Sequence, residues 1–147
     1  MANVAAVGPG GGSRRDTVVE LFARSSSALS FDDGTTVAAG RLLADGQRWA
    51  SVLRDHGLEP GDRVAVRLPN GADYVRLLLA CAVGGFVAVS VNTRYSDGEA
   101  AELVARTGAR TVDVGESWAA HGPADATAGA DDPFVVFTTA GTTCLLY

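Results

Sequence analysis

The hydrophobic positions of the chain fall into two kinds of segment that follow one another in turn. Short apolar runs rich in valine predict β-strands, and longer segments with apolar positions three or four residues apart predict amphipathic helices. The predicted strands cover residues 28–31, 63–68, 86–91, 110–114 and 134–137, and the predicted helices cover about 17–25, 37–56, 71–84 and 97–107. Strand–helix–strand units at this spacing favour right-handed crossovers, so the expected fold class is α/β with a parallel sheet in βαβ layers.

Polar residues next to these segments predict where the helices begin and end. Ser96 and Glu99 form a capping-box pair at the start of the fourth helix. His56 and Gly57 are expected to end the second helix, which gives His56 a structural rather than a catalytic role. The other expected N-cap residues are Asp16, Thr36 and Asn70.

The third predicted helix, 71–84, is apolar on nearly every side, and it is therefore expected to be buried between layers. Cys81 lies within it and is expected to be a small buried hydrophobic side chain. The other cysteine, Cys144, has no histidine or aspartate close to it in sequence, so a nucleophilic role is not expected. The two cysteines show neither a disulfide framework nor the spacing of metal ligands.

Composition and charge narrow the functional classes. The 147 residues are enough for a single domain with a substantial core. The net charge of −5, without a basic block, argues against nucleic acid as a partner. All 12 basic residues are arginine, so this chain supplies no lysine ammonium group to any mechanism. No apolar stretch reaches the length of a membrane span, and a reducing cytoplasm is the expected compartment. Residues 1–15 are expected to be a flexible leader, followed by a domain over 16–147.

A threonine-rich segment directly after the last predicted strand is the candidate binding site. Glycine in such a turn lets backbone N–H groups converge on an anion, and threonine hydroxyls add neutral donors. Ligands of parallel sheets bind at the carboxyl ends of the strands, where this segment lies. The segment contains Thr138, Thr139, Gly141, Thr142 and Thr143, and a turn of this composition can hold phosphate.

Three segments together resemble the adenylate-forming, or AMP-binding, superfamily of acyl-CoA synthetases, aryl-CoA ligases and related enzymes. The first runs from Gly57 to Val66 and continues into Leu68-Pro69-Asn70. The second is 91–95, Val-Asn-Thr-Arg-Tyr, before a capped helix, and the third is 139–143, Thr-Ala-Gly-Thr-Thr. Their order and spacing resemble the family over residues 17–143, which implies the N-terminal portion of the large domain.

The resemblance also implies a reaction and its ligands. In the family a carboxylate attacks the α-phosphate of ATP, giving an acyl-adenylate and pyrophosphate, and a thioester with coenzyme A commonly follows. The resemblance therefore implies ATP with Mg²⁺, CoA and a small-molecule carboxylate as partners. It also implies that the threonine-rich segment is the loop that folds over the ATP phosphates.

The chain departs from the family pattern at and after this loop. Ala140 stands where the family usually has serine, and Cys144-Leu145-Leu146-Tyr147 stands where a small residue and Pro-Lys usually follow. The chain also lacks the family's acidic magnesium residue and its C-terminal domain with the catalytic lysine. The expectation is a partial AMP-binding domain that is inactive alone. The alternatives are a stand-alone interaction or regulatory module derived from that domain and an unrelated flavodoxin-like domain. The flavodoxin-like domain is disfavoured because no glycine fingerprint follows the first parallel strand.

Overall fold

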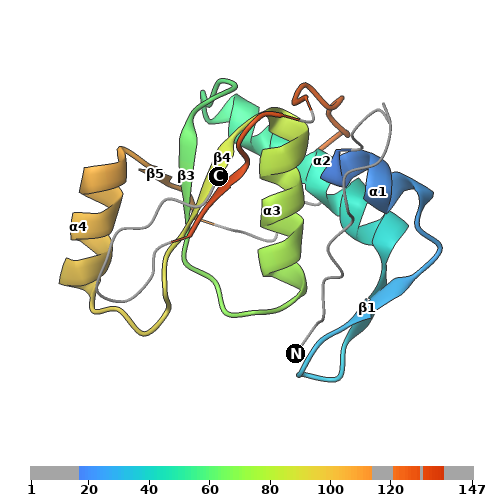
Figure 1. Ribbon diagram of the computed structural model, residues 1–147, viewed down its shortest axis with the longest axis horizontal. Helices are drawn as coiled ribbons and strands as arrows, with labels where there is room; N and C mark the ends of the chain where they lie inside the picture. Colours follow the sequence, from blue (N-terminus) through green and yellow to red (C-terminus); the bar gives the residue numbers. More distant parts are fainter. Residues whose placement is uncertain (1–16, 114–120, 130, 138–147) are drawn as a thin grey trace, which may run out of the picture.

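The computed structural model describes residues 17–113, 121–129 and 131–137. Figure 1 shows a parallel sheet with helices on both of its faces and a separate β-hairpin. The helices are α1 (Val18–Arg24), α2 (Ala39–Asp55), α3 (Ala72–Gly84) and α4 (Asp97–Thr107). The strands are β1 (Ala28–Ser30), β2 (Thr36–Ala38), β3 (Arg63–Val66), β4 (Val87–Ser90), β5 (Arg110–Thr111) and β6 (Val135–Val136). The predicted α/β class with a parallel sheet is confirmed.

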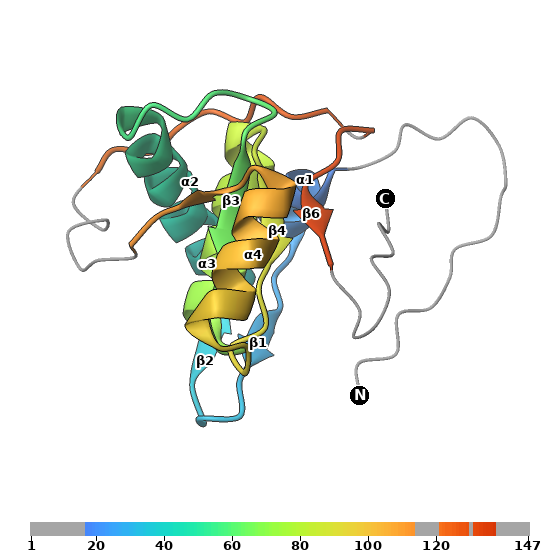
Figure 2. The same cartoon turned by 90° about the vertical axis from the view of Figure 1, so that its left-hand side faces the viewer.

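The order of the strands explains why helices cover both faces. The sheet has the order β5-β3-β4-β6, and all of its neighbours pair in parallel. The connection from β3 to β4 moves one way across the sheet, whereas the connection from β4 to β5 passes back beyond β3. Because such crossovers are right-handed, α3 and α4 lie on opposite faces, as Figure 1 shows. The β1–β2 hairpin extends away from this sheet (Figures 1 and 2).

Alternation along the strands creates two apolar cores, one on each face of the sheet. Val64, Val66 and Ala88 face the larger core, which α1, α2 and α3 cover. Ala65 and Val89 face the smaller core beneath α4. The predicted burial of the third helix is confirmed over its second half, where the side chains from Leu79 to Val83 are at most 4% exposed.

Helices α2 and α3 are joined by a close approach and by a group of charges. A Cβ atom built on Gly46 would lie 2.7 Å from the Cβ of Leu79, so glycine permits the approach. Beside it, Asp45 is the buried charged residue of the described chain, only 8% exposed. Its carboxylate accepts from the guanidinium groups of three arginines, Arg41 and Arg48 on α2 and Arg76 on α3.

Three of the predicted N-caps are wrong, whereas the capping box of α4 is confirmed with Ser96 and Glu99 as its partners. The helices α1, α2 and α3 have as N-caps Thr17, Ala38 and Gly71 instead of Asp16, Thr36 and Asn70. Thr17, rather than the predicted Asp16, is the N-cap of α1, because Thr17 forms a reciprocal capping box with Glu20.

The other two N-cap errors have a different cause. Thr36 is not available as a cap because it belongs to β2, where its hydroxyl lies 2.9 Å from the hydroxyl of Ser30. Helix α3 begins at Ala72, so Asn70 lies one residue too early to cap it. At the other end of α2 the prediction is confirmed, since His56 is the C-cap and Gly57 adopts a φ of +77°.

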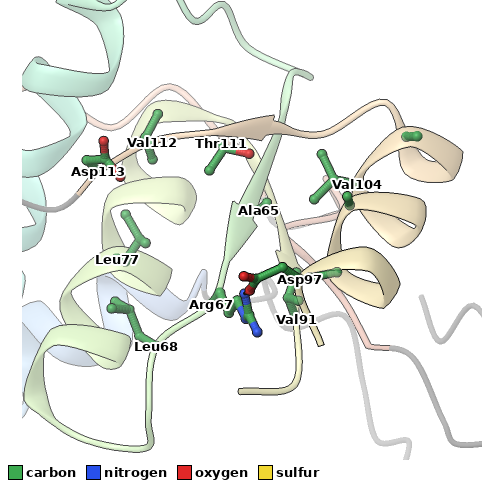
Figure 3. Close-up of a pocket in the computed structure, with 13 residues that line it drawn as sticks. Ala65, Arg67, Leu68, Leu77, Val91, Asp97, Val104, Thr111, Val112 and Asp113 are labelled. Atoms are coloured by element: carbon green, nitrogen blue, oxygen red, sulfur yellow. The ribbon is translucent and has the colours of Figure 1, made fainter. Parts of the chain in front are cut away.

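Strand β5 is shorter than the predicted strand 110–114 and pairs with β3 only at Arg110 and Thr111. The chain then leaves the sheet, and a groove of about 650 Å³ opens between β3, the end of β5 and α4 (Figure 3). Its walls are mostly apolar and include Ala65 from β3, Val104 from α4 and Val112 beyond β5. Helix α4 is therefore separated from part of the sheet that it covers.

Candidate functional site

A polar hollow lies at the carboxyl ends of β3 and β4. The chain leaves β3 toward α3 on one face and leaves β4 toward α4 on the other, and Figure 1 shows the two connections diverging at the lower edge of the sheet. Divergence of this kind creates the crevice in which doubly wound α/β proteins bind their ligands. The hollow has a volume of about 450 Å³ and is lined by Leu68, Pro69, Asn70, Tyr74, Ser90, Val91, Asn92, Thr93, Arg94 and Phe137.

The loop between β4 and α4 forms one wall of this hollow and is held by local hydrogen bonds. The backbone N–H of Val91 donates to the carbonyl of Val66 at 2.9 Å, which ties the start of the loop to β3. The Asn92 carboxamide oxygen accepts from the N–H of Arg94 at 2.9 Å, and the Asn92 carbonyl accepts from Tyr95 at 3.1 Å. These bonds make an Asx turn, which defines the backbone that carries Thr93 and Arg94.

Arg94 gives the hollow its charge. It is the charged residue among the described residues that line the hollow, and it is exposed. Within the described part of the chain, no carboxylate or carbonyl accepts a hydrogen bond from its guanidinium. A guanidinium carries five donors in a planar fork that matches phosphate and carboxylate geometry. Arg94 is therefore available to an anionic ligand.

Neutral hydrogen-bonding groups surround this cation. The Tyr74 hydroxyl, on α3, donates to the Ser90 hydroxyl at the end of β4 at 3.1 Å, which leaves the Ser90 O–H as a further donor. Asn70 and Thr93 line the same hollow. One cation among neutral donors suits an anion better than a metal cation, which the guanidinium charge repels and whose sites commonly include carboxylates.

The structure places the residue before the predicted phosphate loop in this hollow. Phe137 follows β6, is 43% exposed and lines the hollow together with residues from the β3 and β4 connections. The five predicted site residues, Thr138, Thr139, Gly141, Thr142 and Thr143, lie outside the described residues. Their assignment as phosphate-binding residues stays a prediction, and the described chain leads directly to them.

The sequence alone gives no ligand-binding role to the described residues that the structure gathers in the hollow. Arg94 and Asn92 belong to a recognised segment, 91–95, whose order could have indicated a binding loop. Asn70 has the sequence signal of a helix cap rather than of a ligand-binding residue. Their common location depends on the strand order, which places the end of β3 beside the end of β4.

Other reactive side chains do not form a second site in the described chain. Burial raises the pKa of the Cys81 thiol to about 12, so Cys81 is a buried hydrophobic residue, as predicted, and is a poor nucleophile at neutral pH. His121 Nε2 lies 3.6 Å from Oδ2 of Asp55 at the end of α2. No group of three or more His, Cys, Asp or Glu side chains suited to a metal ion occurs in residues 17–113, 121–129 and 131–137. None of the helices in these ranges is long and apolar enough to cross a membrane.

Solved structures share this fold. The N-terminal subdomain of NpsA from Klebsiella oxytoca, in complex with anthranilyl-AMSN, superposes with a TM-score of 0.71 at 20% identity, covering 86% of this chain and 38% of that one. A fatty acyl CoA synthetase from Mycobacterium tuberculosis gives a TM-score of 0.70 at 21% identity, covering 84% of this chain and 32% of that one. At these identities the similarity establishes the fold.

Sequence relatives give a consistent result. A 2-succinylbenzoate–CoA ligase from Oceanobacillus iheyensis is 29% identical over 93 residues, which are 63% of this chain and 19% of the relative. The long-chain-fatty-acid–CoA ligase FadD13 from Mycobacterium tuberculosis is 36% identical over 86 residues, which are 58% of this chain and 17% of the relative. The chain thus spans less than a fifth of the length of these two ligases. Residues 19–124 match the family described as AMP-binding enzyme, and the chain belongs to that family.

Proposed function

We propose that this chain forms the N-terminal part of the nucleotide-binding domain of an ATP-dependent acid–CoA ligase, and that the hollow at the carboxyl edge of the sheet receives the phosphates of ATP. The observation that carries the proposal is the position of Arg94, a cation without a partner among the described residues, in the hollow that Phe137 also lines. The proposed phosphate loop, with Thr139, Gly141 and Thr142, begins one residue after Phe137.

The relatives support the class of reaction. They include ligases named for joining succinylbenzoate or long-chain fatty acids to CoA, as well as acetyl-coenzyme A synthetase. The shared first step of such a reaction is attack of a carboxylate oxygen on the α-phosphorus of ATP. A new C(O)O–P bond then forms, the bond to the β-phosphate oxygen breaks, and pyrophosphate leaves with the electron pair. CoA thiolate then displaces AMP from the acyl-adenylate.

The residues of this chain are assigned to holding the leaving pyrophosphate. Negative charge accumulates on the β- and γ-phosphates as the bond breaks, and a positioned guanidinium with neutral donors stabilises that charge. Arg94 supplies the charge, and Asn70, Thr93 and the threonine-rich loop supply the donors. Magnesium is assigned to the substrate, which enters the proposed site as Mg·ATP.

These residues are enough to bind a nucleotide, but we do not expect them to catalyse the reaction in the isolated chain. Stabilisation of a phosphoryl-type transition state relies on several positioned cations, and this chain has no lysine to add to Arg94. We therefore propose that the isolated 147-residue chain binds nucleotide but forms no acyl-adenylate. The proposal assigns none of the residues that line the hollow to the acyl group.

Titration calorimetry on the purified chain tests this proposal. Mg·ATP and inorganic pyrophosphate are expected to bind, whereas adenosine, which carries no phosphate, is expected to give no measurable heat. Adenosine binding as tightly as ATP would contradict a phosphate site. A mixture of Mg·ATP and a fatty acid that releases pyrophosphate would contradict the absence of turnover.

A further inference from the structure

Two arginines, one at each end of β3, contact the two ends of α4. Arg63, at the start of the strand, donates from Nη1 to the carbonyl of Thr107 at 2.6 Å, at the C-terminal end of the helix. Arg67, just past the end of the strand, donates from Nη1 to Oδ1 of Asp97 at 2.8 Å, at the N-terminal end. Residues two apart in a strand share a face, and Ala65 between these arginines lies in the core beneath α4.

These contacts matter because apolar packing holds α4 incompletely. Only Ala100 and Leu103 of this helix are buried. Val104 is only partly buried against this core, and a groove of about 650 Å³ lies between α4, β3 and the end of β5, with Val104 on its α4 side in Figure 3. The position of α4 over the sheet therefore depends in part on its two polar end contacts.

Arg67 differs from Arg63 in what it holds. Besides Asp97, which lies next to it in Figure 3, its Nη2 donates to the carbonyl of Tyr95. Tyr95 belongs to the loop that carries Asn92, Thr93 and Arg94 along the wall of the hollow. One guanidinium thus spans from the end of β3 to both the loop and the first residue of α4.

We propose that Arg67 is a positioning residue for the anion site. Its guanidinium donates to both Tyr95 and Asp97, and these two hydrogen bonds hold in place the loop that presents Arg94 to the ligand. This inference rests on the proposed phosphate-binding function. Arg67 does not line the hollow and is not assigned a contact with the ligand. Its role depends on the planar fork of arginine, which serves two acceptors at once in one fixed orientation.

The first experiment measures the loop itself and needs no ligand. Hydrogen–deuterium exchange of a peptide covering 91–98 is compared between the wild-type chain, Arg67→Met and Arg63→Met. Faster exchange in this peptide is expected only for Arg67→Met, while Arg63→Met is expected to speed exchange near Thr107. Unchanged exchange over 91–98 in a folded Arg67→Met chain would overturn the positioning role.

The second experiment measures the consequence for binding of Mg·ATP and pyrophosphate by calorimetry. Arg67→Met is expected to weaken binding roughly tenfold, the effect of one displaced charge-assisted contact, while Arg63→Met binds as wild type. Arg67→Lys should recover part of the affinity, because an ammonium group reaches one acceptor but cannot bridge both. Asp97→Asn leaves the hydrogen bond from Arg67 to Tyr95 in place, so this variant should lose less affinity than Arg67→Met.

Three results separate failure of this inference from failure of the proposed function. Wild-type affinity in Arg67→Met, with binding lost in Arg94→Met, would overturn the inference and leave the phosphate site intact. Equal losses in Arg67→Met and Arg63→Met, in step with their melting temperatures, would also overturn it in favour of a general stabilising role. Absence of Mg·ATP and pyrophosphate binding by the wild-type chain would overturn the phosphate site. It would also overturn the proposed effect of Arg67 on binding, whatever rate of hydrogen–deuterium exchange is measured over 91–98.

Discussion

Arg76 Nε lies 3.0 Å from the Asp45 carboxylate and thereby joins α3 to α2 through an ion pair that is largely out of water. The side chains of Arg76 and Asp45 are 22% and 11% exposed. Their geometry is favourable, and removal of Asp45 would take from Arg41, Arg48 and Arg76 the acceptor that they share, at a place that is largely out of water. The stability of the contact between the two helices therefore depends on Asp45 more than on the exposed ion pairs.

Asp45→Ala is expected to lower the free energy of unfolding by about 2 kcal/mol, because three arginines lose their shared acceptor while solvent screens part of the cost. Urea denaturation followed by circular dichroism measures the change. Asp73→Ala is the matched control, since Asp73 contacts the same Arg76 at 2.7 Å but its side chain is 60% exposed. Equal losses for the two variants would contradict a special role for the buried carboxylate.

Two glycines on α2 are expected to respond to alanine in opposite directions. Gly46→Ala places a Cβ 2.7 Å from the Leu79 Cβ and 3.3 Å from the Ala80 nitrogen, and overpacking of this kind costs about 1–3 kcal/mol. Gly40→Ala meets nothing within 4 Å and should gain up to about 1 kcal/mol from helix propensity. Melting temperatures of both variants test the pair, and a stable Gly46→Ala protein would argue against the close approach of α2 and α3.

The backbone N–H of Ser96, and after it the Ser96 hydroxyl, lower the pKa of Glu99 below its ordinary value of 4.5. A lowered folded-state pKa means that the capping contribution is present above pH 4.5 and is lost as the pH falls through the lowered value. The difference in melting temperature between wild type and Glu99→Gln should therefore shrink on acidification from pH 6 to below 4.5. Glutamine keeps the capping geometry without a titrating proton, so a pH-independent difference would refute this linkage.

Arg94→Met should weaken binding of Mg·ATP and of pyrophosphate by about tenfold or more, since hydrogen bonds to charged groups contribute about 1.5–3 kcal/mol. Calorimetry at two salt concentrations measures the loss and should show a weaker salt dependence in the variant. Arg106→Met is the control, because Arg106 is also exposed but lies on α4 beside Glu102. A comparable loss in both variants would indicate a general effect of net charge rather than a site at Arg94.

Cys81 should react with thiol reagents only after unfolding. Burial raises its pKa to about 12, so little thiolate forms at pH 8 and the reagent has no access to the sulfur. A Cys144→Ser variant leaves Cys81 as the one thiol, and its labelling is followed spectrophotometrically with and without urea. Native labelling as fast as that of the unfolded chain would contradict the buried position.

Hydrophobic periodicity was sufficient to predict the parallel sheet and all four described helices, because those signals are local. The capping box of Ser96 and Glu99 could also be predicted from the sequence, since both partners lie within one helical turn. Thr36 was misassigned because its partner, Ser30, belongs to another strand and outcompetes the local cap. Asp45 and Arg76 could not be paired from sequence, since the ion pair exists only once α2 and α3 pack together.

Only part of the candidate site could be predicted from the sequence, for the same reason. The threonine-rich loop follows from composition and resemblance, and it stays a prediction. Arg94 lies on the connection after β4, whereas Asn70 lies on the connection after β3, and only the strand order brings them to one hollow. Nothing in the local sequence of either segment indicates the other.

The late return of β6 to the sheet has a kinetic consequence. Strands β3 and β4 are neighbours joined by a single helix, so their contacts have low contact order and are expected to form early. Strand β6 pairs with β4 only after the chain has passed through α4 and β5 and past α2, so loop closure must precede this pairing. On a ribosome, the residues of this hollow that follow β6 would be synthesised after its other walls, so the proposed nucleotide site would form only after β3 and β4 have paired.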